Sequence, residues 1–252
     1  MYEIQKASML KRISAFLLDF VLMTIAVTGF ALLVSLMTGR MKHVDKMEER
    51  EAYYEEKYDV DFGITEEKFN SLTEDEQKHL DNAYNEFRRD EEYNVALSKS
   101  ISQLMLMVTF GFLLSFILLE LVIPIIFGNG QTVGKKVFNL GVVHVNAVKI
   151  SGVGLFARSI LGKYTVETMI PVVLMLMMFL GGSASGIIVI GLLIILEIFA
   201  FFKNKMNTPI HDVLSHTVCV DLSVQLIYRT EQELIDHKTR LHNEIVDRSG
   251  EC

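Results

Sequence analysis

Residues 11–37 read KRISAFLLDFVLMTIAVTGFALLVSLM, and this stretch decides the class of the fold. A helix needs about 20 mostly apolar residues to cross a bilayer, and residues 13–37 meet this requirement with Asp19 as their only charge. Lys11 and Arg12 precede the run, as in a secretory signal. The run is too long for a signal core, however, and no small-x-small cleavage site follows it. We therefore expect a retained membrane anchor.

Three further segments qualify as membrane spans, and each contains one acidic residue. They are 101–127 with Glu120, 164–180 with Glu167 and 187–202 with Glu197. Because lipid offers backbone groups no hydrogen-bond partner, each span is expected to be helical. The last two spans are joined by GGSASG at 181–186, which predicts a tight turn. The sequence thus predicts an all-α membrane protein with a four-helix transmembrane bundle.

Charge is distributed unevenly along the chain, although the net charge is only -7 at pH 7. Residues 38–99 hold 18 Asp and Glu against 10 Lys and Arg, while residues 121–166 hold five bases and no acid. Such segregation is typical of a chain sorted across a membrane and argues against a nucleic-acid partner. Bases near the helix ends favour a multi-pass plasma-membrane protein, embedded in the lipid bilayer with both termini in the cytoplasm.

The pattern divides the chain into four parts. These are the N-terminus with the first span (1–37), an acidic helical extracytoplasmic insert (38–99), the rest of the membrane domain with three spans and a cytoplasmic loop (100–222), and a charged cytoplasmic tail (223–252). In the insert, Thr73 and Glu76 have the spacing of a helix capping box. We expect the insert to form a helical hairpin, with its second arm running into the second span.

Two short segments of the membrane domain predict β structure. Residues 140–145 and 217–222 are short, apolar and rich in β-branched side chains. Both lie on the same predicted side of the membrane, so we expect them to pair in a small cytoplasmic ribbon.

Motifs for metal, phosphate and covalent chemistry are incomplete. Cys219 and Cys252 have no neighbour at metal-ligand spacing, so no disulfide framework or zinc site is expected. The dipeptide His211-Asp212 occurs in metal hydrolases, but no further His/Asp set at ligand spacing accompanies it. Residues 130–136, GQTVGKK, lack the first glycine and the Ser or Thr of a phosphate loop. We therefore predict no enzymatic activity, no metal and no cofactor.

The four intramembrane acids are the residues most suited to function. At about 1.5 Å rise per residue, all four lie roughly 5–12 Å inside the cytoplasmic boundary. A charge near the bilayer core costs at least a few kcal/mol, so such residues face the bundle interior and often mark ion or proton pathways. The candidate ion or proton site is formed by Asp19, Glu120, Glu167 and Glu197.

Basic residues lie just below this layer of acids. Arg12 precedes Asp19 by seven residues and therefore shares its helix face. Arg158, Lys163 and Lys135 are also within reach as charge partners. Two interpretations stay open: a water-accessible site for a cation or proton, or ion pairs that only lock the helices together.

Three stretches in order resemble the RDD family of small bacterial membrane proteins. They are KRISAFLLD at 11–19, GQTVGKK at 130–136 and PIHDVLSHTV at 209–218. The residues that match the family pattern are Arg12, Asp19, Gly130, Gln131, Thr132, Gly134, Lys135, His211, Asp212 and Thr217. The arginine and two aspartates of the family name correspond to Arg12, Asp19 and Asp212. The sequence departs from the pattern at Ser215-His216 and in the length of its outer loop.

The resemblance implies a polytopic membrane protein, and some members are thought to exchange monovalent cations for protons as dimers. We therefore expect a small-cation/proton transporter in which Asp19 and Glu120 are the carriers, Arg12 tunes them, and a homodimer completes the pathway. The alternative is a non-transport scaffold or accessory protein that binds a partner through its insert or tail. Transport predicts carboxylates on one connected face, whereas a scaffold predicts that each carboxylate is capped by its own base.

Overall fold

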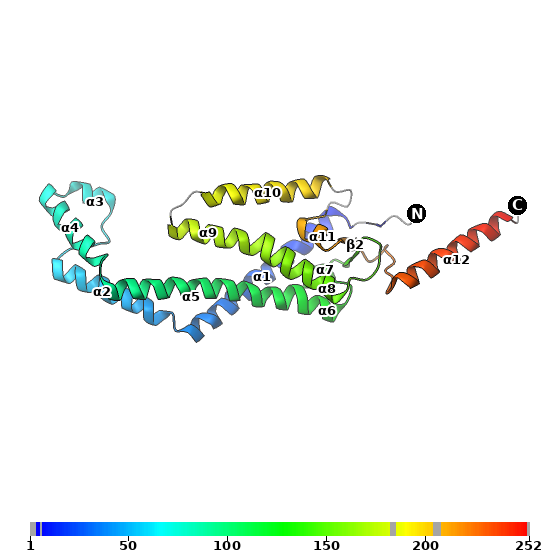
Figure 1. The fold of residues 1–252 in the computed structure, drawn as a ribbon, viewed down its shortest axis with the longest axis horizontal. Helices are drawn as coiled ribbons and strands as arrows, with labels where there is room; N and C mark the ends of the chain where they lie inside the picture. The colour runs from blue at the N-terminus through cyan, green and yellow to red at the C-terminus, as the bar shows by residue number, and fades with distance from the viewer. Residues whose placement is uncertain (1–3, 6, 182–184, 204–207, 251–252) are drawn as a thin grey trace. The chain divides into compact units, whose positions relative to one another are not determined.

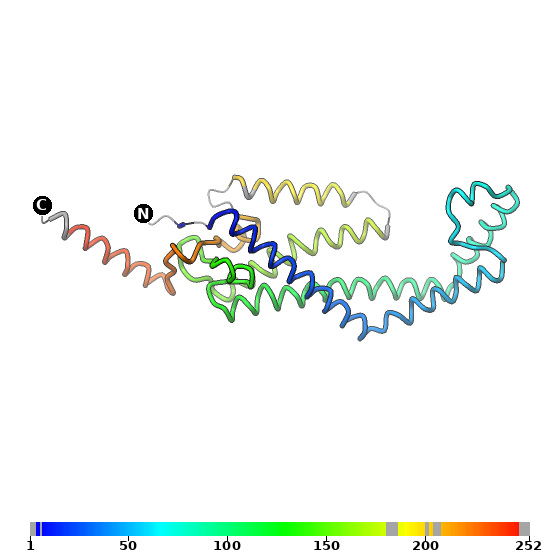
Figure 2. Tube along the Cα trace, turned by 180° about the vertical axis from the view of Figure 1, so that it is seen from behind, coloured from blue at the N-terminus to red at the C-terminus, as the bar shows by residue number. Residues whose placement is uncertain are grey.

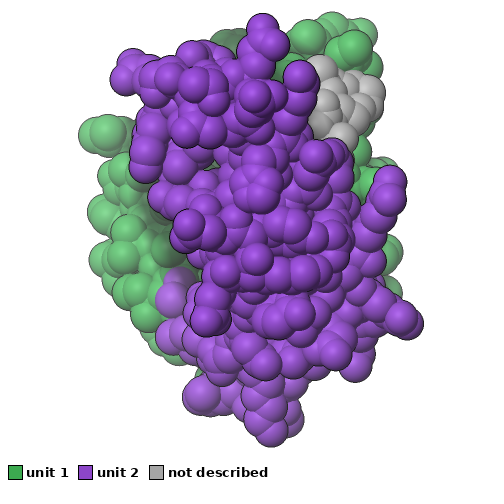
Figure 3. Space-filling model, turned by 90° about the vertical axis from the view of Figure 1, so that its left-hand side faces the viewer, with its two compact units in different colours: residues 1–27, 112–252 green, residues 28–111 purple. Residues whose placement is uncertain are grey.

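The computed structural model describes residues 4–5, 7–181, 185–203 and 208–250 of the 252-residue chain. The chain divides into two compact units, residues 1–27 with 112–252 and residues 28–111 (Figure 3). The boundaries between them fall inside two long helices. The first unit contains every candidate site residue named above.

Three helices are long and apolar enough to cross a membrane. They are α1 (Met9–Thr38), a continuous helix made of α5 (Glu91–Phe116), η1 (Ile117–Val122) and α6 (Ile123–Phe127), and a second continuous helix made of α8 (Gly152–Phe156), η2 (Ala157–Met169) and α9 (Ile170–Gly181). These helices support the expected helical membrane architecture, because length and apolar composition are what spanning requires.

The fourth expected span lies in α10 (Ser185–Lys203), whose apolar part, Gly186–Phe199, is shorter than the other three spans. Helices α9 and α10 pack side by side and antiparallel, as expected for a helical hairpin (Figures 1 and 2). Most of the turn predicted between them, residues 182–184, lies outside the described residues.

The third long helix begins at Gly152, well before the apolar run that predicts it. The Ser151 hydroxyl accepts a hydrogen bond from the Gly154 amide, which is a typical helix N-cap. The charged stretch that follows continues as helix instead of ending it. Hydropathy alone misplaces this boundary because it detects apolar residues, whereas the helix includes Arg158 and Lys163.

Both of the continuous helices contain a π-helical segment that ends just before a proline. Glu120 stands four residues before Pro124, and Glu167 stands four residues before Pro171. Proline has no amide hydrogen, so the carbonyl four residues earlier loses its helical partner. At Glu120 the Ser159 hydroxyl replaces it, donating to the Glu120 carbonyl at 2.6 Å. Such π turns occur frequently at functional sites.

The expected β ribbon is confirmed. Strands β1 (Leu140–His144) and β2 (Thr217–Asp221) pair antiparallel, with Leu140 opposite Asp221. Their valines form a fully buried core, and the Ala7 amide donates to the Cys219 carbonyl at 3.2 Å. The ribbon thereby joins the start of α1 to two loops that are distant in sequence.

A short helix next to the ribbon, α7 (Val133–Val137), packs very closely against α1. A Cβ atom at Gly134 would lie 2.3 Å from the Ala15 carbonyl oxygen and 2.8 Å from the Asp19 carboxyl carbon. Real Cβ atoms do not approach so closely, because interiors are packed to the density of crystals. Glycine is therefore required at this position by the approach of the two helices.

The second unit, residues 28–111, consists mainly of three helices and the start of α5. They are α2 (Met41–Tyr58), α3 (Glu66–Ser71) and α4 (Glu74–Phe87). The capping box predicted at Thr73 and Glu76 is confirmed, with the Glu76 carboxylate 2.8 Å from the Thr73 amide. Tyrosine and phenylalanine rings pack between the helices, the closest pair being Phe87 and Tyr93 with centroids 4.4 Å apart.

Helix α4 ends at Phe87 instead of running on into α5, and Asp90 occupies the break between them. Its carboxylate accepts hydrogen bonds from the Tyr93 amide at 2.7 Å, from Arg50 at 2.5 Å and from the Tyr54 hydroxyl at 3.2 Å. Asp90 thus caps α5 and ties it to α2 at the same time. The tail ends in a separate helix, α12 (Glu231–Gly250).

Gly134→Ala tests the close approach of α7 and α1. The added methyl group overlaps backbone, which cannot rotate away, so we expect a loss of about 2–3 kcal/mol. The midpoint of thermal unfolding of the purified protein in detergent should fall accordingly. Gly29→Ala, where a Cβ meets nothing within 4 Å, is the matched control and should leave the midpoint unchanged. Equal midpoints for the two variants would refute the packing argument.

The Asp90 cap gives a pH-dependent prediction. The hydrogen bond from Arg50 lowers the pKa of the Asp90 carboxyl below its usual value, against the opposing effect of burial. A carboxyl with a lowered pKa in the folded state stabilises above its unfolded pKa of about 4. That stabilisation disappears as the pH falls through the folded-state pKa.

We expect Asp90→Asn to destabilise residues 28–111 by about 1–2 kcal/mol at pH 7, and the difference from wild type to shrink below about pH 4. Near-ultraviolet circular dichroism follows this unit, because five of the eight tyrosines lie in it. Asp81→Asn, at an exposed position in α4, is the control. A pH-independent difference between Asp90→Asn and wild type would show that the charge is not the cause.

Candidate functional site

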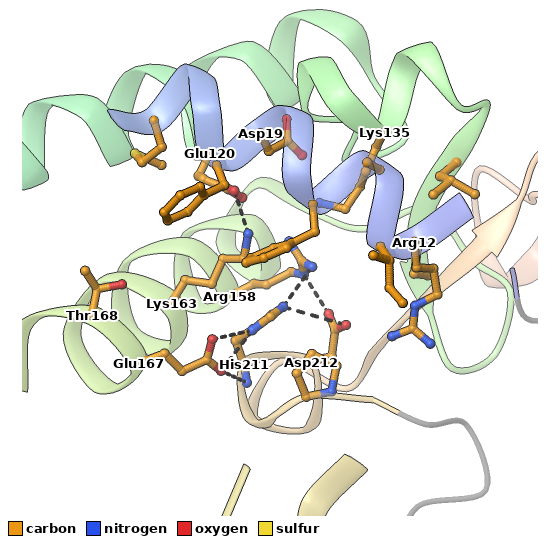
Figure 4. Close-up of a pocket in the computed structure, with 18 of the residues that line it drawn as sticks. Arg12, Asp19, Glu120, Lys135, Arg158, Lys163, Glu167, Thr168, His211 and Asp212 are labelled. Atoms are coloured by element: carbon orange, nitrogen blue, oxygen red, sulfur yellow. Dashed lines mark hydrogen bonds and ion pairs between the residues drawn. The ribbon is translucent and has the colours of Figure 1, made fainter. Parts of the chain in front are cut away.

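A cavity of about 690 Å³ lies within the first unit and collects the predicted site residues (Figure 4). Its lining includes all four candidate carboxylates and all four candidate charge partners: Asp19, Glu120, Glu167, Glu197, Arg12, Lys135, Arg158 and Lys163. His211 and Asp212 line it as well. Residues from α1, η1, α7, η2, α10 and the short helix α11 (Ile210–Leu214) therefore converge on one space.

Asp19 is held by the loop that carries α7. Its two carboxylate oxygens accept hydrogen bonds from the Thr132 hydroxyl at 2.5 Å and from the Gly134 amide at 2.7 Å. Thr132 also caps α7 through its contact with the Lys135 amide. Asp19 thus fixes the loop against α1. Arg12 lines the same cavity, at a different level of α1 from Asp19 (Figure 4).

Glu120 forms an ion pair across two helices. One of its oxygens lies 2.5 Å from the ammonium group of Lys163, and the residue is only 3% exposed. Its other oxygen, Oε2, is buried and has no hydrogen-bond partner among the residues that the structure describes. Leaving a buried charged acceptor unsatisfied costs on the order of 1–3 kcal/mol or more. This oxygen is therefore a described acceptor that a bound water or cation could satisfy.

Arg158 and Asp212 form the most deeply buried ion pair described, with each residue 2% exposed. Arg158 Nε donates to Asp212 at 2.7 Å, and the Thr217 hydroxyl donates to the same carboxylate oxygen at 2.7 Å. Burial alone would raise the pKa of Asp212, but the positive charge and hydrogen bond of Arg158 hold it well below its usual range. The pair is therefore ionised and braces η2 against α11 and β2.

His211 bridges this pair to a second acidic group. Burial lowers the pKa of His211, despite the raising effect of Asp212, so the imidazole is neutral near pH 7. Its Nε2 lies 3.0 Å from an Arg158 nitrogen, and its Nδ1 lies 2.8 Å from Glu167. Arginine only donates hydrogen bonds, so Nε2 accepts and Nδ1 carries the proton. That tautomer donates from Nδ1 to Glu167.

Glu167 and Glu197 approach the same end of α11. The His211 amide donates to Glu167 at 2.8 Å, and the Ile210 amide donates to Glu197 at 3.1 Å. Gly162 permits α11 to lie this close to η2. A Cβ atom at Gly162 would lie 2.6 Å from the His211 side chain, so any larger residue would clash with α11. One ligand atom each from the two carboxylates and the imidazole lie within 4.8 Å of one another.

Lys135 completes the basic side of the cavity. It is 9% exposed, and its ammonium group lies 3.4 Å from the Thr132 hydroxyl. Burial lowers the pKa of Lys135, and the nearby positive charges lower it further, while Glu120 and Asp19 oppose this shift. Lys135 is thus the described base whose proton is made easier to remove by its surroundings.

The described lining carries more acidic than basic groups. Five carboxylates face four permanently basic side chains; the acids are Asp19, Glu120, Glu167, Glu197 and Asp212, and the bases are Arg12, Lys135, Arg158 and Lys163. His211 apart, the described lining thus has one more carboxyl group than basic side chains. Buried charges are costly unless they are paired or neutralised, so this cavity favours the entry of a cation or a proton.

Sequence reasoning found the acids but missed their grouping. It did not foresee that Glu167 and Glu197 meet at His211, or that Lys163 is the partner of Glu120. One sequence signal for the helix geometry was available: Glu-x-x-x-Pro occurs at 120–124 and again at 167–171. A glutamate four residues before a proline predicts a locally opened helix at that glutamate.

Comparison with known proteins identifies the family of the chain. Residues 6–216 match the model of the RDD family. Neither curated proteins nor solved structures gave a match. The matched region spans most of the chain and includes Arg12, Asp19 and Asp212, all of which line the cavity. This chain is therefore a member of the RDD family of membrane proteins.

Proposed function

We propose that this protein exchanges a small monovalent cation for protons across the plasma membrane, using the acidic cavity of its membrane domain. The observation that carries the proposal is the excess of carboxylates over bases in one cavity among apolar helices. A cavity lined by more carboxyl groups than basic side chains, in a low-dielectric region, favours cations over anions. Monovalent cations and protons are thus the species that the site suits.

Glu120 and Lys163 are the proposed exchange pair. A cation that enters the cavity binds the Oε2 atom of Glu120, which has no described partner, and competes with the Lys163 ammonium 2.5 Å from the other oxygen. When the cation binds, it displaces the Lys163 ammonium from the pair, and the added positive charge favours the loss of one proton from the cavity. When a proton returns, the ammonium re-forms the pair and the cation leaves. One positive charge replaces another, so the cycle is electrically balanced.

Asp19 has a positioning role in this scheme. Its two hydrogen bonds to the 132–134 segment already satisfy its carboxylate. It holds α7 in place, and α7 in turn brings Lys135 to the cavity. The carrier function that the sequence suggested for Asp19 and Glu120 together is therefore assigned to Glu120 with Lys163.

The proposed topology has four spans, both termini in the cytoplasm, and residues 38–99 outside. Helix α10 serves as the short fourth span. Its side chains Ile187, Ile188 and Ile195 are more than half exposed, which suits contact with lipid or with a second copy. We propose a homodimer, because four helices enclose a pathway poorly by themselves.

A non-transport scaffold is the second candidate function. The ion pairs Glu120–Lys163 and Arg158–Asp212 favour it, because each holds two elements together without any ligand. In that case the acidic unit at 28–111 or the tail would bind a protein partner, and the cavity would be a by-product of structural pairing.

Proteoliposomes with a pH-sensitive dye inside separate the two functions. For wild type we expect proton flux that depends on an imposed Na⁺, Li⁺ or K⁺ gradient. Glu120→Gln removes the charge that the cation binds, so cation-dependent flux should fall at least about tenfold. Glu67→Gln, at an exposed position in α3, is the matched control and should retain full flux.

Two outcomes would contradict the exchange function. One is wild-type protein, folded and inserted, that shows no cation-dependent proton flux. The other is undiminished flux in Glu120→Gln. A thermal unfolding scan of each variant in detergent separates loss of function from loss of fold.

A further inference from the structure

Glu167, Glu197 and His211 form a group that the exchange pair does not use. They come from three separate elements, η2, α10 and α11, so the tertiary fold brings them together. One potential ligand atom of each lies within 4.8 Å of the other two. His211 is 7% exposed, and all three residues line the cavity; Figure 4 shows Glu167 beside His211. The group is thus a set of two half-buried carboxylates and one buried imidazole.

We propose that this group binds a divalent transition-metal cation such as Zn²⁺ or Mn²⁺. Zinc binds histidine nitrogen and carboxylate oxygen at about 2.0–2.2 Å. Two donors on one tetrahedral ion are therefore about 3.4 Å apart. The atoms observed within 4.8 Å need to close by no more than about 1.4 Å, which rotation of the two glutamate side chains supplies.

The charge of the group fits a divalent ion. When a metal binds, both carboxylates are deprotonated and give a charge of −2, and the neutral imidazole adds a nitrogen donor without adding charge. Carboxylates this close repel one another, and a cation between them turns that repulsion into attraction. The imidazole nitrogen in the set favours zinc or iron over Mg²⁺ and Ca²⁺, while the two carboxylates also suit Mn²⁺.

A second, independent observation indicates that this cavity accepts a ligand. The Glu120 Oε2 atom is buried, lines the same space, and has no hydrogen-bond partner among the described residues. A polar atom of this kind normally contacts a water or an ion in a folded protein. The cavity volume of about 690 Å³ has room for a hydrated metal ion.

Metal binding requires one change in hydrogen bonding. The metal takes the Nδ1 lone pair of His211, so the imidazole proton moves from Nδ1 to Nε2 and no proton is lost. The Arg158 nitrogen that now donates to Nε2 at 3.0 Å must then release it. Arg158 stays in place through its Nε contact with Asp212, at 2.7 Å.

This metal site is separate from the monovalent-cation exchange at Glu120 and goes beyond the proposed function. Its test does not depend on transport, because binding is measured in detergent without any gradient. Full-length protein is purified without a histidine tag, and bound metal is removed with a chelator. Binding of ZnCl₂ and of MnCl₂ is then measured separately by isothermal titration calorimetry, with MgCl₂ in excess as competitor. We expect one saturable site per chain for at least one of the two ions.

Glu167→Gln and Glu197→Gln each remove one charged ligand and should weaken binding at least about tenfold. Glu197→Asp keeps a carboxylate and should recover part of the loss. Glu67→Gln, far from the cavity in sequence and exposed, is the control with unchanged affinity. Glu120→Gln should retain the metal while losing exchange, which distinguishes failure of this inference from failure of the proposed function.

The inference is overturned if the folded protein shows no saturable site for either ion. It is equally overturned if the glutamine variants at 167 and 197 bind as tightly as wild type. Thermal unfolding scans with and without metal give a second readout. Metal should raise the midpoint of wild type and of Glu67→Gln, and leave that of Glu197→Gln unchanged.

Discussion

A carboxylate among apolar helices must be met by a hydrogen-bond donor or a cation, and the first unit is organised by this constraint. Asp19 binds the loop at 132–134, Glu120 binds Lys163, and Asp212 binds Arg158. Each of these contacts joins elements that are distant in sequence. The interactions that compensate the charges are therefore the same ones that set the packing of the helices, which apolar contacts alone specify weakly within lipid.

Each of the three prolines of the chain lies within four residues of a residue that lines the cavity. Pro124 and Pro171 each follow a π-helical segment, and those two segments carry Glu120, Arg158, Lys163 and Glu167. Pro209 begins α11, which presents His211 and Asp212. Opening of the helix backbone at these points explains why charged side chains from several elements reach one cavity. The same backbone irregularity would be costly if it faced lipid.

Much of the fold could be predicted from sequence, because its signals are local. The length of the apolar runs predicted the membrane helices, and the alternation of β-branched residues predicted the β ribbon. The spacing of Thr73 and Glu76 predicted the helix cap. The partners of the buried charges could not be predicted in this way. Asp19 shares a helix face with Arg12, yet its described hydrogen bonds come from Thr132 and Gly134, more than 110 residues away. Which charged side chains pair depends on tertiary contacts, and the spacing of residues along the sequence does not reveal these contacts.

The central claim is that buried charges on different helices hold one another in place, and Glu120 with Lys163 tests it most directly. A double-mutant cycle of Glu120→Gln and Lys163→Met, read by unfolding free energy in detergent, isolates their interaction. The account predicts a coupling free energy of about 1.5–3 kcal/mol, with the double variant more stable than the sum of the single losses implies. Additivity within about 0.5 kcal/mol would contradict it.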